Sequence, residues 1–445
     1  VLKVYNQVRI SSIKEKIGMV GENIGDFFGM FKPERFGDGN FYLIGAFANV
    51  GMVDTDDGII LFDVALEGFG DKVFKMVRSI SQKPVSHIIL SHGHFDHGFG
   101  YQTFFDEIKE NGWNAPEVIA HENILERYEK YKMLDRYHNW INAQQFSSVL
   151  FGKERNIVSA KKPLSPTVLV KNKGNYSFKK GGYNFEIHAE WGETDDALWM
   201  YCPEQGVIFT GDLFLYSFPN VGNPFKVQRY PKRWAKALDK MLALGPEYLV
   251  PGHGQLISGS DNVEEALKIT RDALNFVHDN VVDKLNEGKW FEQVYHEMME
   301  IFPEKFKKND YLRPIYGCYQ YAIHCTYRLY HGWYDTGNPT DLFPSKREDI
   351  AQEILGISGN EGGLKFLNRA KELIKMEKLQ IALHLLDVIL DANNVDPSIF
   401  QETLKVKMKT LKKQARKEPS LITRNIIKNH AKFLKDRLKN ESLDS

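Results

Sequence analysis

The stretch that most constrains this fold is residues 91–100, which read SHGHFDHGFG. An apolar run at 85–90 precedes it, and its composition predicts a buried strand that ends where the polar residues begin. A strand that stops at an H-x-H-x-D-H spacing directs several side chains at one point beyond the sheet edge. Imidazole and carboxylate groups together suit zinc, and also iron or manganese. The spacing therefore predicts a metal site with four ligands, namely His92, His94, Asp96 and His97.

Further ligands are expected at the ends of later strands, because a two-metal centre needs about six or seven protein donors. One apolar run ends in Asp212, within TGD, and another ends in His253, within PGHG. The neighbouring glycines let the backbone turn sharply after each strand. Taken singly, Asp212 could be a helix N-cap and His253 a turn residue. Together with the upstream cluster, both are predicted metal ligands.

One more donor is expected from the segment 192–196, GETDD, which precedes another strand. Glu193 is the favoured candidate. The alternatives that stay open are Asp195, Asp196 and His188. Asp63, near the end of an early strand, is a candidate for orienting a ligand histidine, or else a turn cap.

The chain organisation predicts an α/β domain followed by helices. Short β-rich runs, beginning with an antiparallel meander between residues 41 and 62, alternate with helical stretches, which favours a β-sandwich flanked by helices on both outer faces. From about residue 262 the strand patterns stop and helical periodicity takes over. The predicted domains are a catalytic domain at 1–262, an all-helical domain at 263–400 and a basic helical segment at 401–445.

Charge and composition exclude some partners. Lys+Arg and Asp+Glu both total 58, so the balance favours neither nucleic acid nor an anionic membrane. Residues 401–445 carry 13 Lys/Arg against 5 Asp/Glu, which indicates solvated helical faces or a basic docking surface. We expect no membrane span, because no run of about 18 apolar residues exists. Three cysteines without a CxxC pair fit a reducing, cytoplasmic location. A trimmed leader stays open because the chain starts at Val1.

The order H-x-H-x-D-H, TGD and PGHG resembles the metallo-β-lactamase superfamily, whose fold is an αββα sandwich. More specifically, the chain resembles the alkylsulfatase branch of dinuclear zinc hydrolases, in which a glutamate precedes a bridging carboxylate by 19 residues, as Glu193 precedes Asp212. The segments 327–335, YRLYHGWYD, and 337–339, GNP, resemble the all-helical dimerisation domain of that branch. The resemblance implies a homodimer that hydrolyses a sulfate ester or a related small-molecule ester.

The resemblance also implies a ligand set with two Zn²⁺ ions, iron or manganese staying open. Asp212 would bridge the metals together with a hydroxide, and Asp96 and Asp212 would be the catalytic carboxylates. Metal 1 would take His92, His94 and Glu193, and metal 2 would take Asp96, His97 and His253.

Two departures from the branch bear on the substrate. The branch has a bridging glutamate where this chain has Asp212, and its His-Asn pair at the sulfate end has no counterpart between residues 213 and 234. Arg229 and Arg233 are the candidates for binding an anionic substrate, because a guanidinium offers a planar fork of donors. The alternative is that both are exposed charges at the start of a helix.

Other functions stay open beside the sulfatase hypothesis. One is a hydrolase of the same fold that acts on another ester, a lactone or a phosphoester. A diiron redox protein is disfavoured because His94 stands where such proteins use a carboxylate ligand. A non-catalytic metal-stabilised scaffold is disfavoured because it has no need of an open two-metal site.

Overall fold

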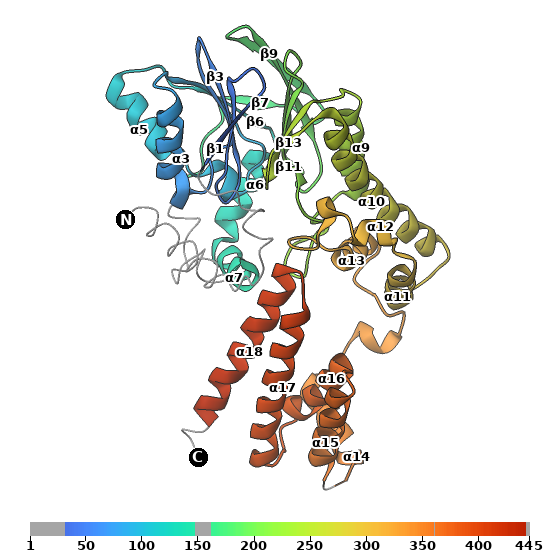
Figure 1. Cartoon of the computed structure of the whole chain (residues 1–445). Helices are drawn as coiled ribbons and strands as arrows, with labels where there is room; N and C mark the ends of the chain where they lie inside the picture. The colour runs from blue at the N-terminus through green and yellow to red at the C-terminus, as the bar shows by residue number, and fades with distance from the viewer. Residues whose placement is uncertain (1–31, 147–161, 360, 442–445) are drawn as a thin grey trace. The chain divides into compact units, whose positions relative to one another are not determined.

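The computed structural model of the chain describes residues 32–146, 162–359 and 361–441 (Figure 1). These residues form two compact units. Unit 1 comprises the described parts of 1–141 and 151–335, and unit 2 those of 142–150 and 336–445. The units divide the chain at a different place from the expected domain boundaries near residues 262 and 400, which stay predictions.

The first sheet of unit 1 has seven strands in the order of the sequence. Strands β2 to β4 form the expected antiparallel meander, which β1 extends by one more antiparallel strand, and β4 to β7 pair in parallel. Every residue of β4 is buried, as its continuous apolar run GIILF indicates. The strands are β1 (Pro33–Phe36), β2 (Phe41–Ile44), β3 (Val50–Thr55), β4 (Gly58–Phe62), β5 (Val85–Ile89), β6 (Glu117–His121) and β7 (Val168–Val170).

The second sheet has six strands in the order β13-β12-β11-β10-β9-β8. Its pairs are antiparallel except β11 with β12, which run in parallel. The carboxyl ends of these two parallel strands lie at the same edge, so the side chains there are brought together. The strands are β8 (Asn175–Lys180), β9 (Tyr183–Glu190), β10 (Ala197–Cys202), β11 (Val207–Leu215), β12 (Tyr248–His253) and β13 (Ile257–Ser258).

The two sheets pack face to face with helices outside them, as Figure 1 shows. Phe41 and Phe62 from the first sheet share an apolar core with Ile187 and Phe209 from the second. Apolar faces of α3 (Glu67–Ile80), α5 (Gln102–Asn111) and α6 (Ile124–Met133) cover the first sheet. Helices α9 (Pro231–Leu242) and α10 (Ser260–Asn286) cover the second. The predicted αββα sandwich is confirmed.

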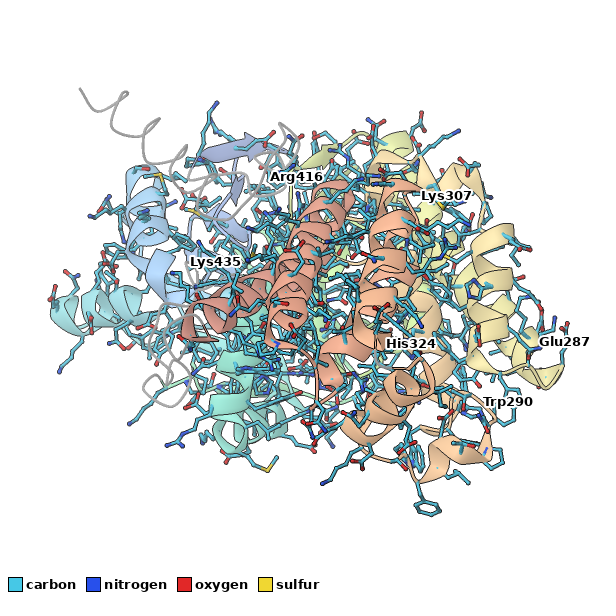
Figure 2. The ribbon with its side chains drawn as sticks, turned by 90° about the horizontal axis from the view of Figure 1, so that it is seen from below. Glu287, Trp290, Lys307, His324, Arg416 and Lys435 are labelled. Carbon is cyan, nitrogen blue, oxygen red and sulfur yellow. The ribbon has the colours of Figure 1, made fainter. Side chains whose placement is uncertain are left out.

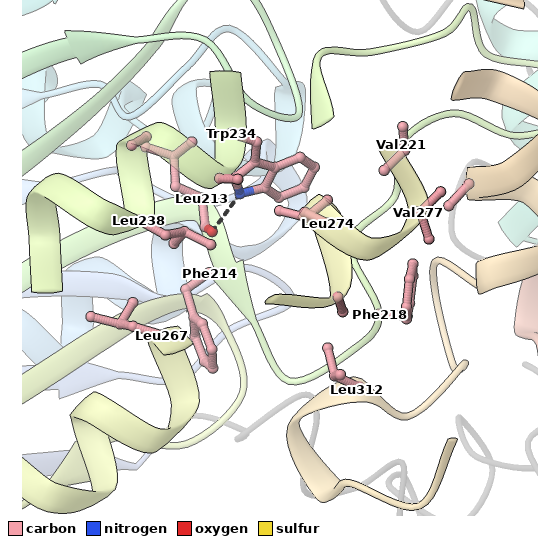
Figure 3. Close-up of a cluster of buried hydrophobic side chains, with 14 of the residues drawn as sticks. Leu213, Phe214, Phe218, Val221, Trp234, Leu238, Leu267, Leu274, Val277 and Leu312 are labelled. Carbon is pink, nitrogen blue, oxygen red and sulfur yellow. Dashed lines mark hydrogen bonds between the residues drawn. The ribbon is translucent and has the colours of Figure 1, made fainter. Parts of the chain in front are cut away.

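Trp234 packs α9 against the second sheet (Figure 3). Its side chain is fully buried, and the indole Nε1 donates a hydrogen bond to the Leu213 carbonyl at 2.7 Å. Leu238 from the same helix and Leu274 from α10 belong to the same core cluster. Since Leu213 directly follows Asp212, this packing fixes the stretch of β11 that carries the predicted bridging carboxylate.

Unit 1 continues beyond α10 with shorter helices. These are α11 (Phe291–Ile301), α12 (Glu304–Lys307), the 3-10 helix η1 (Asp310–Leu312) and α13 (Tyr319–Tyr330). The segment 313–318 is bonded to the chain that follows β11: Phe218 N donates to the Arg313 carbonyl at 2.9 Å, and Tyr316 N donates to Ser217 Oγ at 3.0 Å. Gly317 permits this close approach, because a Cβ there would lie 2.3 Å from the Phe218 carbonyl oxygen.

Unit 2 is helical in its described part. It contains η2 (Pro339–Leu342), α14 (Arg347–Ile357), α15 (Gly362–Lys375), α16 (Leu379–Asp391), α17 (Pro397–Lys417) and α18 (Leu421–Glu441). The basic residues of the last segment lie on α17 and α18, where Figure 2 labels Arg416 and Lys435. Part of this charge is compensated, since Lys413 and Lys417 pair with Glu377. Among the described helices of the chain, none is long and apolar enough to cross a membrane.

Two short helices of the described chain remain. They are α4 (Phe95–Gly98), which follows β5, and α7 (Asp135–Phe146), which follows α6.

Candidate metal centre

Seven acidic and histidine side chains meet at the edge of the two sheets. They form two groups, and within each group one potential ligand atom per residue lies within 4.8 Å of all the others. These atoms come from the loop after β5, from α4, from the loop between β9 and β10, and from β11 and β12. The first group is His92, His94, Glu193 and Asp212, and the second is Asp96, His97 and His253. All seven predicted ligands are thus brought together.

Asp212 lies between the two groups. Its Oδ1 is 3.4 Å from His97 Nε2 and 3.5 Å from His253 Nε2, whereas its Oδ2 is 3.9 Å from His92 Nε2. Gly252 makes the room for this carboxylate, because a Cβ there would lie 2.1 Å from Asp212 Oδ1. One carboxylate therefore presents one oxygen to each group, which is the arrangement that a bridging ligand needs.

The ring nitrogens that face away from the centre are held by other groups. His97 Nδ1 lies 2.7 Å from Asp63 Oδ2, and His253 Nδ1 lies 2.7 Å from the Phe47 carbonyl. A carboxylate and a carbonyl oxygen both accept hydrogen bonds, so each Nδ1 carries a proton and each Nε2 is the ring nitrogen that faces the centre. Asp63 therefore contacts a predicted ligand histidine, and its orienting role stays a prediction.

Asp63 is itself fixed in an unusual conformation. Its φ of 68° is in the left-handed region that non-glycine residues rarely adopt. Its second oxygen, Oδ1, accepts a hydrogen bond from Ser91 N at 2.7 Å. The Ser91 hydroxyl in turn lies 2.9 Å from His92 Nδ1. Through these contacts the end of β4 fixes the beginning of the metal-ligand loop, which is the loop after β5 that carries His92 and His94.

Glu193 uses its two oxygens differently. Oε1 accepts hydrogen bonds from Arg229 Nη1 and from the Tyr316 hydroxyl, the latter at 3.3 Å. Oε2 is buried, has no hydrogen-bond partner among the described residues, and lies 3.9 Å from His94 Nδ1. Burial raises the pKa of Glu193 to about 8, although the Arg229 guanidinium acts in the opposite direction. Glu193 thus turns one oxygen toward the histidines and anchors the other.

The alternatives to Glu193 are engaged elsewhere. Asp196 accepts hydrogen bonds from Arg127 Nε at 2.8 Å and from Gly93 N at 3.0 Å. Asp195 pairs with the same arginine. His188 stacks on Trp199 with ring centroids 4.0 Å apart. Of the open candidates, the geometry places Glu193 beside His92 and His94.

The two arginines that were expected to bind substrate lie in different surroundings. Arg229 is buried and donates to Glu193 and to the Asn220 carbonyl, the latter at 2.7 Å. Arg233 is exposed on α9, with its guanidinium 3.8 Å from the ring centroid of Trp191. The substrate-binding role of both stays a prediction, and the observed contacts of Arg229 are those of a group that positions Glu193.

Sequence reasoning missed three side chains around the centre. Arg127 holds Asp196 beneath the metal-ligand loop, and Tyr316 reaches Glu193 from a distant segment. Lys226 is partly buried near both groups; burial and the Arg229 guanidinium lower its pKa to about 7, while Glu193 and Asp96 raise it. No motif in the sequence marks these residues, because each acts through a contact made only in the folded chain.

The donors fit divalent cations. His97 Nε2, Glu193 Oε2 and Asp212 Oδ1 are among the buried side-chain atoms of the described residues without a hydrogen-bond partner. A buried polar atom left unsatisfied costs about 1–3 kcal/mol, and a cation bound between the groups would remove this cost. Although burial lowers the pKa of His97, the negative charges of Asp212, Asp63 and Asp96 raise it well above its usual value. The pocket is therefore one that attracts positive charge.

Comparisons with known proteins agree with this fold and site. Residues 43–253 match the metallo-beta-lactamase superfamily, and residues 291–437 match the alkyl sulfatase dimerisation domain. The chain thus combines a metallo-β-lactamase domain with an alkylsulfatase dimerisation domain, as the sequence motifs predicted.

Several similar proteins of known function are alkylsulfatases. A linear primary-alkylsulfatase from a Pseudomonas strain is 26% identical over 325 residues, which cover 69% of this chain and 60% of that protein. An (R)-specific secondary-alkylsulfatase from Pseudomonas sp. is 26% identical over 348 residues, covering 73% of this chain and 51% of the relative. The chain thus spans between half and three-fifths of their lengths.

A solved structure shares the fold over most of the chain. The stereoselective inverting sec-alkylsulfatase Pisa1 from Pseudomonas sp. superposes with a TM-score of 0.73 at 19% identity, covering 89% of this chain and 64% of that one.

Proposed function

We propose that this protein is a metal-dependent hydrolase of sulfate esters. The observation that carries the proposal is the position of Asp212, whose two oxygens face two separate groups of buried donors. The metals would be two divalent cations, with zinc as the expected identity, because histidine and carboxylate ligands suit it. When bound, such a pair supplies Lewis acidity and an activated water nucleophile.

Within this proposal each donor group holds one cation. Asp212 would contact both cations, in keeping with its place between the groups. Metal 1 would be held by His92, His94 and Glu193, and metal 2 by Asp96, His97 and His253.

The protein's own groups preorganise this centre. Asp63 and the Phe47 carbonyl fix the rings of His97 and His253, and Arg229 with Tyr316 fixes Glu193. A centre held this rigidly does not have to reorganise during the reaction.

Asp96 is the more exposed of the two predicted catalytic carboxylates. Its side chain is 19% exposed, whereas that of Asp212 is 5% exposed. Its Oδ2 lies 3.4 Å from His253 Nε2, so this oxygen would help to hold metal 2. Asp96 would thus act at the open side of the site, and Asp212 would lie between the two groups.

A sulfate ester is the favoured substrate because the similar proteins are alkylsulfatases. The second candidate is another ester, a lactone or a phosphoester. Asp212 is the observation that favours it, since this shorter carboxylate resembles the bridging ligand of the wider superfamily. We also propose a homodimer formed through the helical region, because residues 291–437 match a dimerisation domain. A cytoplasmic location stays a prediction.

A hydrolysis screen with elemental analysis tests the function. The purified protein, loaded with zinc, iron or manganese, is assayed against alkyl sulfates, phosphoesters and lactones, with His97→Ala as the inactive control. We expect about two equivalents of zinc and turnover of alkyl sulfates that the control lacks. If the protein bound two metals and hydrolysed none of these esters, the proposed hydrolase function would be wrong. Bound iron together with electron transfer would favour the redox alternative.

A further inference from the structure

Helix α17 carries a row of basic side chains on one face. Its four members follow one another at spacings of four, three and four residues. On a helix with about 3.6 residues per turn, this spacing places them on a single stripe. The row is about 16 Å long, and all four side chains are exposed. Its members are Lys405, Lys409, Lys412 and Arg416.

Helix α18 carries a second row with the same spacing. Its members are exposed as well, and Lys432 and Lys435 form the middle of the row. Figure 2 labels one residue of each row, Arg416 and Lys435. The complete second row is Lys428, Lys432, Lys435 and Lys439. Two neighbouring helices of unit 2 therefore present basic residues in the same pattern.

The two rows lie on the same side of the helical hairpin. Leu404 of α17 and Leu434 of α18 belong to one core cluster, which joins the two helices. Arg437 of α18 lies over the ring of Phe400 of α17, 4.7 Å from its centroid, so these two residues mark one side of the hairpin. At about 100° per residue, each row lies roughly 150–170° around its own helix from that marker. Both rows therefore face the opposite side.

The positive charge of this face is turned to solvent. Among the described residues, Lys412, Arg416, Lys432 and Lys435 form neither hydrogen bonds nor ion pairs, and the same holds for Lys405 and Lys409. Glu402 attracts Lys405 and Lys409, but its carboxylate is paired with Lys371 at 2.9 Å. Asp436 is the exposed acidic residue beside the second row. The face thus carries a net positive charge that the hairpin itself does not neutralise.

The chemistry of the face selects its partner. A second copy of the chain is disfavoured, because in a symmetric pair the same patch meets itself and like charges would oppose one another. Nucleic-acid recognition favours arginine and stacking aromatic rings, whereas the rows contain one arginine, Arg416, and no aromatic residue. Lysine is a compact, strongly hydrated charge. Rows of lysines therefore fit a flat surface with diffuse negative charge.

We propose that the two basic rows of the α17–α18 hairpin bind an anionic lipid surface. Clusters of about four to eight basic residues on a helix are typical of such binding, since each charge is attracted to the negative potential of the leaflet. Two rows on one side of a hairpin can approach a flat array of lipid head groups together, without a pocket. The inference goes beyond the proposed hydrolase and does not depend on it, because none of the seven metal donors lies on these helices.

The test is cosedimentation of the protein with vesicles. We expect the wild type to bind vesicles of equal parts phosphatidylcholine and phosphatidylserine but not vesicles of phosphatidylcholine alone, because only the former carry a negative surface charge. Binding should weaken as the salt concentration rises. Replacing the four basic residues of the α17 row by glutamine should weaken binding at least about tenfold. Lys432→Gln combined with Lys435→Gln should weaken it about fivefold.

The matched control removes the same charge from scattered places. Its four substitutions fall on α3, α5, α9 and α15, and each residue that they replace is exposed. The control should bind the anionic vesicles within about threefold of the wild type, because both basic rows remain. Equal losses in the control and in the α17-row variant would assign binding to net charge and overturn the docking face. The substitutions are Lys75→Gln, Lys109→Gln, Lys236→Gln and Lys375→Gln.

Other outcomes also decide against the lipid surface. A wild type that binds no anionic vesicles at low salt, or that binds both kinds of vesicle equally, overturns the proposal. If duplex DNA binds through the α17 row while anionic vesicles do not, the face belongs to a nucleic-acid partner instead. Thermal melting is followed by circular dichroism for each variant. If the α17-row variant does not fold, the double variant at Lys432 and Lys435 decides in its place.

Discussion

The two donor groups are built in different ways. In the second group, His97 and His253 are held by Asp63 and by the Phe47 carbonyl, which lie at strand ends and in loops of the sandwich itself. In the first group, Glu193 is held by Arg229 and by Tyr316, and Tyr316 comes from the region that matches the dimerisation domain. The sandwich thus supports one group by itself, whereas the other also uses a later segment, 313–318.

The change with the largest expected effect is at the residue that both groups share. Asp212→Asn should reduce activity by about a hundredfold or more, because the carboxylate charge between the groups is lost. Metal analysis of the purified variant should show fewer bound cations per chain than in the wild type. Activity within threefold of the wild type, with both metals retained, would show that Asp212 does not join the groups.

Asp63→Asn should weaken the second group alone. Loss of the carboxylate that orients His97 is expected to lower metal affinity there by about 10–100-fold. Titration with a chelator, followed by metal analysis, should show one cation released early and the other retained. If both cations were released together, Asp63 would support both donor groups and not the second group alone.

Tyr316→Phe is the corresponding test of the first group. The substitution removes one hydrogen bond from Glu193 Oε1 but leaves Arg229 in place, so we expect about a tenfold or smaller loss of metal affinity. The same chelator titration reports it. Tyr311→Phe, which changes a nearby tyrosine that packs on Tyr216, is the control and should behave like the wild type.

The smallest effect is expected at His188, a histidine outside both groups. Burial, with a contribution from Lys240, lowers its pKa to about 4, below the ordinary value of about 6.5. As the pH falls, His188 is protonated in the unfolded chain before it is protonated in the folded protein. The contribution of His188 to stability is therefore present above pH 6.5 and is lost as the pH falls toward 4. His188→Phe should therefore flatten the dependence of Tm on pH in this range. An unchanged slope would assign the acid sensitivity to other groups.

The sequence predicted the sandwich and the ligands that share a local motif. His92, His94 and His97 follow one strand, so their proximity depends only on local geometry. Glu193 could not be separated from Asp195 and Asp196 in the sequence, because all three are carboxylates of one short loop. The loop orients Glu193 inward, while Arg127 draws Asp195 and Asp196 away.

The contacts that support Glu193 could not be predicted from the sequence, for a different reason. Arg229 is 36 residues from Glu193 and Tyr316 is 123 residues away. Such pairings arise from tertiary packing, which leaves no periodic or spaced pattern in a single sequence.

The contact between Tyr316 and Glu193 has a consequence for maturation. Synthesis runs from the N-terminus, so all seven donors leave the ribosome before Tyr316 is made. A chain that stops after β12 would contain every predicted metal ligand but would lack the Tyr316 hydroxyl that donates a hydrogen bond to Glu193. The metal affinity of the first donor group would then rise when the segment 313–318 docks, which couples metal binding to the later folding of unit 1.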